Sequence, residues 1–287
     1  MSVSKINELR VSFESLGIFR GLLKDSPFQK LYELIKYIDE GNYDIIKTIS
    51  FYNDFYFDLM QKSNGCGLKE YIIERILFDE NLFAKKASQN IEDISPTLKE
   101  AVSSDLDSLE FISSFTPQDI KDIFDSKKAK SFHYKKLESI GGWDLKVPDS
   151  LPNYAKSIIN KFLSTSNWNK LIEDLVCFHK KHGWGIFARY RGFSWNGKDL
   201  VGIESIDPIK LCELVNYERQ KKIVVDNTLA FLKGYKVNNI LLYGSRGTGK
   251  SSTVKAILNE YYEHGLRVVE IFKENLHTFP DLVNIIK

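Results

Sequence analysis

Cysteine, methionine and proline are scarce in this chain. Its 287 residues include only three cysteines, two methionines and seven prolines. Cys66, Cys177 and Cys212 lie far apart and form no CxxC pair, which argues against a disulfide framework or a zinc site and favours a reducing compartment. No apolar run approaches the roughly 20 residues of a membrane-spanning helix. The polar start, Met1 to Phe13, lacks the features of a signal peptide. We therefore expect a cytoplasmic protein without a membrane partner.

A strong charge of either sign is also missing. The formal net charge is +2, and 43% of the residues are hydrophobic and 27% charged, as in an ordinary globular protein. So small a net charge gives little attraction toward nucleic acid or an anionic membrane. The length is enough for about two domains.

One octapeptide carries a specific chemical signal. Gly244-Ser245-Arg246-Gly247-Thr248-Gly249-Lys250-Ser251 matches G-x-x-x-x-G-K-[ST], the phosphate-binding P-loop or Walker A motif. Glycines allow backbone angles that turn successive N–H groups inward as an anion-binding nest. Lys250 adds a charge for the β- and γ-phosphates, and the Ser251 hydroxyl is placed to hold Mg²⁺ with the nucleotide. The candidate nucleotide-binding residues are Gly244, Ser245, Arg246, Gly247, Thr248, Gly249, Lys250, Ser251 and Ser252.

The context of the octapeptide fits this interpretation. Residues 239–243 form a short apolar run typical of a buried parallel strand, residues 251–263 have helical spacing before Gly265, and residues 266–271 predict a second strand. Residues 281–286 predict a following helix. The positive end of the helix dipole at Gly249 would face the phosphates. The alternative is that the octapeptide is a glycine turn between a strand and a helix and binds no ligand. Arg246 has two possible roles, contact with phosphate or exposure to solvent.

Helical patterns dominate the rest of the chain. They cover residues 28–38, 43–60 with an interruption at Asn53 and Asp54, 68–83, 106–115, 120–124, 153–163 and 167–179, with a loop over 88–98. Gly141-Gly142 and Pro148 indicate a boundary. We predict an α/β protein in three parts: a helical N-terminal domain over 1–147, an α+β connecting region with a hairpin over 148–205, and a partial P-loop module over 206–287.

Weaker signals allow two interpretations each. Residues 184–195 alternate like a strand, and Asn196-Gly197 favours a hairpin, although Arg189, Arg191 and the neighbouring aromatic residues are also suited to stacking single-stranded bases. The small net charge argues against such nucleic-acid binding. His179 and His182 could bind a metal, but the helix end that carries them is expected to be solvated. Asp207 before Pro208 indicates a helix start.

The stretch from Leu214 to Lys255 resembles the AAA+ ATPases, and more closely an uncharacterised bacterial family of AAA+-like ATP-binding proteins known as a domain of unknown function. Its most specific part is Asn238 through Thr253, and the other stretches are 200–204, 217–221 and 227–232. The resemblance implies ATP and Mg²⁺ as ligands. It also implies an adenine pocket at Leu214, Val215 and Tyr217, where the alternative is packing at a helix start. Many members have glycine where this chain has Asn216.

AAA+ modules continue into an acidic Walker B strand, a polar sensor residue and usually an arginine finger. None of these follows before Lys287, so we expect a truncated or shortened protein that hydrolyses ATP only if the missing part is present. An oligomeric ring and a protein partner for the helical domain are family expectations. The alternatives are a non-enzymatic nucleotide sensor or interaction module acting through the helical half, and a small-molecule kinase.

Overall fold

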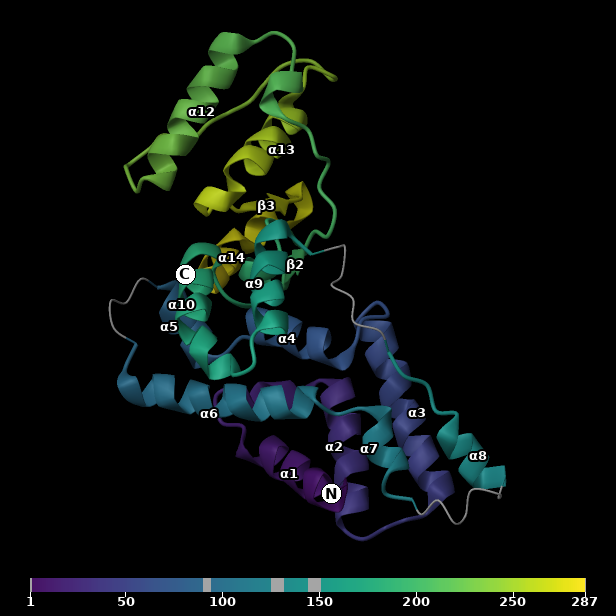
Figure 1. Ribbon diagram of the computed structural model, residues 1–287. Helices are drawn as coiled ribbons and strands as arrows, with labels where there is room; N and C mark the ends of the chain where they lie inside the picture. The colour runs from purple at the N-terminus through teal and green to yellow at the C-terminus, as the bar shows by residue number, and fades with distance from the viewer. Residues whose placement is uncertain (1, 90–93, 125–131, 144–150, 287) are drawn as a thin grey trace. The chain divides into compact units, whose positions relative to one another are not determined.

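The chain folds into two units, Met1–Lys180 and Lys181–Lys287, and each is described by itself. A computed structural model describes residues 2–89, 94–124, 132–143 and 151–286 (Figure 1). The expected combination of a mainly helical part and a partial α/β module is confirmed. The division into three parts at residues 147 and 205 stays a prediction. Each of the described helices is too short or too polar to cross a membrane.

The first unit consists of amphipathic helices around one apolar core. Its elements are α1 (Ser2–Ser15), η1 (Arg20–Lys24), α2 (Ser26–Asp39), α3 (Ile45–Lys62), α4 (Leu68–Phe78), α5 (Leu82–Ser88), α6 (Pro96–Ser113), α7 (Pro117–Lys121), α8 (Phe132–Glu138), α9 (Asn153–Ser164), η3 (Trp168–Leu171) and α10 (Ile172–His182), whose end reaches the second unit. Helix α2 packs between α1 and α3, and α6 packs on α1 and η3.

Most helical predictions hold, and the corrections have local causes. Asn53 and Asp54 do not interrupt α3, because both face solvent while Tyr52 and Phe55 on the same helix are buried. The pattern over 68–83 divides into α4 and α5, because Asn81 caps α5 by accepting a hydrogen bond from the Ala84 N–H at 2.8 Å. Helix α6 starts well before residue 106, and α7 ends before residue 124. The expected loop over 88–98 lies partly outside the described residues.

A half-buried carboxylate joins three helices of this unit. Asp25 precedes α2 and accepts hydrogen bonds from Lys62 at 2.6 Å and from the Tyr71 hydroxyl, and Arg75 lies 3.1 Å from it. Burial by itself raises the pKa of Asp25, but the bonds from Lys62 and Tyr71 and the charge of Arg75 outweigh it and lower that pKa. A lowered pKa in the folded state stabilises the fold above the ordinary carboxyl pKa, and this stability is lost as the pH falls through the lowered value.

We predict that Asp25→Asn lowers the free energy of unfolding by about 1–3 kcal/mol at pH 7, because Lys62 and Arg75 lose their shared anion. Urea denaturation followed by circular dichroism measures the change, and the difference from the wild type shrinks below about pH 4. Asp174→Asn is the matched control, because the Lys161–Asp174 pair is exposed and worth at most about 1 kcal/mol. Equal losses in the two variants would contradict the anchoring role of Asp25.

The second unit is built around a small mixed sheet. Its elements are α11 (Gly185–Arg189), β1 (Gly192–Trp195), β2 (Leu200–Gly202), η4 (Leu211–Glu213), α12 (Glu218–Leu232), α13 (Lys250–Tyr261), η5 (Tyr262–His264), β3 (Val268–Ile271), η6 (Lys273–Thr278) and α14 (Phe279–Ile286). The strand order is β2-β1-β3, with β1 antiparallel to β2 and parallel to β3. A buried cluster of Val224, Ile257, Leu258 and Leu266 joins α12 and α13 to the start of β3.

The hairpin predicted from Asn196-Gly197 is present. Trp195 pairs with Leu200, the Asn196 side chain accepts hydrogen bonds from the N–H groups of Lys198 and Asp199, and Gly197 has φ +98°. The alternating pattern before it was misleading, because Gly185–Arg189 is the short helix α11 and not a strand.

Two predictions next to the P-loop are wrong. Residues 239–243 form no strand in the described chain, and Leu241 and Tyr243 are 82% and 87% exposed. The physical reason is that none of the described strands pairs with residues 239–243, so this apolar run lacks the hydrogen bonds and the cover that a sheet provides. Asp207 does not start a helix, because the chain stays irregular until η4 and its carboxylate pairs with Lys255 at 2.5 Å.

We predict that Leu241→Ser changes the free energy of unfolding by less than about 0.5 kcal/mol, because its side chain is already solvated. Leu258→Ala on α13 is the matched control, and it should cost about 2–5 kcal/mol because Leu258 is 3% exposed. Urea denaturation of the full chain measures both. A loss at Leu241 as large as the loss at Leu258 would restore the buried strand expected from the sequence.

Candidate nucleotide-binding loop

The glycines of the octapeptide adopt the conformations for which glycine is needed. Gly244, Gly247 and Gly249 have φ values of +144°, +80° and +80°. Nothing lies within 4 Å of where a Cβ would stand at Gly247 or Gly249, so the requirement at these two positions is the backbone angle and not the space. Gly249 immediately precedes α13, which begins at Lys250. The sequence therefore folds into a tight turn that ends at a helix N-terminus.

Lys250 folds back across this turn. Its Nζ donates to the carbonyl oxygens of Gly244 at 3.0 Å and Ser245 at 2.7 Å, and to the Thr248 hydroxyl at 3.3 Å. The ammonium is thereby held above the start of the loop and does not extend into solvent. A fixed positive charge at this place is suited to a phosphate group that approaches the loop.

Backbone donors complete the positive side of the loop. In the described chain, the N–H groups of Gly249, Lys250 and Ser251 meet no acceptor, as the geometry of a helix start requires. They add to the positive end of the dipole of α13. Residues 244–247 and Ser251 are solvent-exposed, whereas Gly249 and Lys250 are half-buried. Arg246 is also exposed, and either of its two roles remains compatible with this position.

The metal-binding role predicted for Ser251 can be tested against its surroundings. Ser251 is exposed and lines a cavity of about 420 Å³ between α13 and the sheet, together with Asp207 and Glu270. Asp207 already pairs with Lys255. No group of three or more acidic, histidine or cysteine side chains among the described residues forms a metal site. A Mg²⁺ ion at this loop would need further ligands from a nucleotide, and Ser251 stays its predicted protein ligand. Ser252 is half-buried behind Ser251.

The residues predicted to contact adenine are Leu214, Val215 and Tyr217, before α12. Val215 and Tyr217 are 78% and 55% exposed, and Asn216 and Tyr217 both have positive φ. The Leu214 carbonyl accepts a hydrogen bond from Lys221 at 2.7 Å. The structure brings the loop residues together, whereas Val215 and Tyr217 are exposed and Leu214 is half-buried. Their contact with adenine stays a prediction.

Two residues of α13 that the motif search missed connect the loop helix to the segment before η4. Lys255 pairs with the Asp207 carboxylate, and the Asn259 amide donates to the carbonyls of Asp207 at 2.8 Å and Ile209 at 2.9 Å. Ser251, Lys255 and Asn259 follow each other at a spacing of four, which places them on one face of the helix. That spacing could have shown from the sequence that these residues share a helix face, but it does not identify the segment that the face contacts.

Two alternative sites lose support. His179 and His182 are 1% and 6% exposed, so the expectation of a solvated helix end was wrong, and the ring of His179 packs against Phe83 and Phe178. Phe193 and Trp195 are fully buried. Rings inside a core are not accessible to nucleic-acid bases, so the hairpin interpretation of residues 184–195 is favoured over base stacking.

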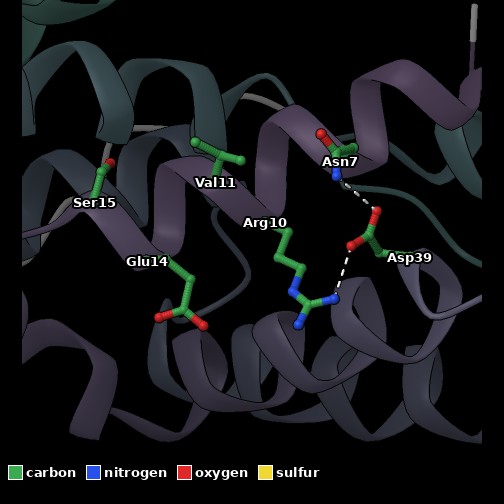
Figure 2. Close-up of a pocket in the computed structure, with 6 residues that line it drawn as sticks. All are labelled: Asn7, Arg10, Val11, Glu14, Ser15 and Asp39. Atoms are coloured by element: carbon green, nitrogen blue, oxygen red, sulfur yellow. Dashed lines mark hydrogen bonds and ion pairs between the residues drawn. The ribbon is translucent and has the colours of Figure 1, made fainter.

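A second cavity, of about 510 Å³, lies along α1 in the first unit (Figure 2). Its charged groups bind one another: Arg10 contacts Asp39 at 2.8 Å, Asn7 donates to the same carboxylate at 3.2 Å, and Glu14 accepts from the Tyr32 hydroxyl. Figure 2 shows Arg10 and Asn7 both turned toward Asp39. The P-loop therefore remains the stronger candidate site.

Comparisons with known proteins give a family match and two partial relatives. Residues 188–287 match a family described as "Protein of unknown function (DUF815)". The chain is also similar to the replication factor C large subunit of Nanoarchaeum equitans, with 42% identity over 64 residues, which are 22% of this chain and 14% of that protein. The same subunit of Staphylothermus marinus is 36% identical over 81 residues, 28% of this chain and 18% of that protein.

The resemblance to an uncharacterised AAA+-like family is confirmed. At the level of the family, this weak similarity suggests nucleotide binding. The chain spans less than a fifth of the length of these two curated relatives. No solved structure matches the chain.

Proposed function

We propose that this chain binds a nucleoside triphosphate, ATP with Mg²⁺, through the loop from Gly244 to Ser252. The observation that carries the proposal is the Lys250 ammonium held beside open N–H groups at the start of α13. The backbone donors and Lys250 hold the phosphates, and Ser251 holds the nucleotide-bound Mg²⁺. Leu214, Val215 and Tyr217 are the candidate contacts of the adenine base.

The proposal concerns nucleotide binding alone. Hydrolysis of the nucleotide would need more groups than the P-loop provides. Phosphoryl transfer to water needs a positioned nucleophile and charge stabilisation beyond the P-loop. Glu270 and Asp207 are carboxylates in the cavity that Ser251 lines, but Asp207 is occupied by Lys255. Binding without turnover describes a nucleotide sensor, whose response would be passed to a protein partner or a second copy. A Mg-ATP hydrolysis assay on the same chain separates the sensor from an ATPase.

We predict that Lys250→Ala weakens Mg-ATP binding about 10- to 100-fold, because a charge-assisted contact worth about 1.5–3 kcal/mol is lost. Isothermal titration calorimetry of the full chain measures the affinity. Lys222→Ala on α12 is the matched control, because it removes the same charge from a side chain that is 76% exposed and paired with Asp226. EDTA should weaken ATP binding by the wild type if Ser251 and Mg²⁺ act together. Unchanged ATP affinity in Lys250→Ala would remove the basis of the proposal.

A further inference from the structure

Lys250 reaches the start of the loop beside a second side chain, Thr248. The Thr248 hydroxyl donates a hydrogen bond to the Ser245 carbonyl at 2.9 Å and accepts one from Lys250 Nζ at 3.3 Å. Lys250 Nζ also contacts the Ser245 carbonyl directly. Thr248, Lys250 and Ser245 therefore form a closed triangle of hydrogen bonds across the turn. Of the three positions, the P-loop pattern specifies only the lysine, so the pattern itself does not require a hydroxyl at residue 248.

The same hydroxyl lies against the first glycine of the loop. A Cβ at Gly244 would stand 3.4 Å from the Thr248 Oγ1, which is ordinary contact distance. Gly244 and Thr248 thus approach each other across the turn, while Gly247 and Gly249 have no such neighbour. Thr248 is half-buried, whereas residues 244–247 are exposed. Its side chain therefore lies across the turn from Gly244 and is bonded to the Ser245 carbonyl.

We propose that Thr248 is a positioning residue, which holds the Lys250 ammonium and the Ser245 carbonyl in the geometry that receives the triphosphate. This inference rests on the proposed function of the loop. A lysine side chain has large conformational freedom, and fixing it costs up to about 2 kcal/mol of entropy on binding. A hydroxyl that restrains the lysine before the ligand arrives removes part of that cost from the binding reaction. Thr248 acts through Lys250 and the backbone, so its expected effect is on affinity.

The test compares Thr248→Val, which keeps the shape without the hydroxyl, with Thr248→Ser, which keeps the hydroxyl without the methyl group. Titration calorimetry with Mg-ATP and, separately, with inorganic tripolyphosphate measures the affinity of the full chain. Thr248→Val should weaken both ligands about tenfold, the equivalent of one lost hydrogen bond, and Thr248→Ser should bind within about threefold of the wild type. Equal weakening for the two ligands is expected because the hydroxyl acts on the phosphate end and not on the base.

Thr228→Val on α12 is the matched control. Its hydroxyl donates to the Val224 carbonyl at 2.8 Å within the helix, so the same substitution is made away from the loop. Thermal unfolding of each variant shows whether the second unit is still folded. Binding by Thr248→Val equal to that of the wild type would overturn the positioning role, and so would equal weakening in Thr248→Val and Thr248→Ser, because the hydroxyl would then not be the active group.

Failure of the two proposals can be told apart. Absence of Mg-ATP binding by the wild type would overturn the proposed function and this inference with it. Binding that is lost in Lys250→Ala but retained in Thr248→Val would leave the proposed function intact and overturn the role of Thr248 alone. Weakening in Lys250→Ala and Thr248→Val together, with recovery in Thr248→Ser, is the result that supports both.

Discussion

The second unit depends on the parallel pairing of β1 with β3. Gly192 is opposite Val268 in this ladder, and the Val268 N–H donates to the Arg191 carbonyl at 3.2 Å. Arg267, the residue before Val268, donates to the backbone carbonyls of His182, Phe187, Tyr262 and Leu266. One guanidinium therefore bonds several backbone carbonyls, and it fixes the point where the chain leaves α13 and enters the sheet. Since α13 carries the P-loop at its other end, this pairing also positions the loop.

The segment before the loop stays outside this sheet. A strand needs a neighbour for its hydrogen bonds, and in the described chain residues 239–243 pair with neither of the outer strands, β2 and β3. These residues are irregular, with Leu241 exposed to solvent. Side chains of this kind on a surface mark a region suited to contact with other protein elements. Figure 1 shows this stretch running beside α12, to which the Asn227 side chain links it through the Asn238 carbonyl at 3.1 Å.

How much the sequence could predict depends on whether a signal is local. Glycine positions in the loop, the start of α13 near Gly249 and the Asn196-Gly197 hairpin follow from backbone preferences of a few neighbouring residues, and all are present. Whether residues 239–243 form a strand depends on a distant strand with which they could pair, and no local pattern encodes that partner. The burial of His179 and the pairing of Asp207 with Lys255 likewise depend on contacts between segments far apart in the chain.

The P-loop turn is formed although residues 239–243 before it form no strand, and the reason is that the hydrogen bonds of the turn join residues close together in the sequence. Every bond that shapes the turn joins residues at most six apart: Lys250 to Gly244 and Ser245, and Thr248 to Ser245. Such contacts close short loops at small entropic cost and need no support from a sheet. The helix that follows is held separately, because Ile257 and Leu258 are buried in the cluster with Val224 and Leu266. The conformation of the turn is therefore specified by the octapeptide and its helix, and it does not require residues 239–243 to form a strand.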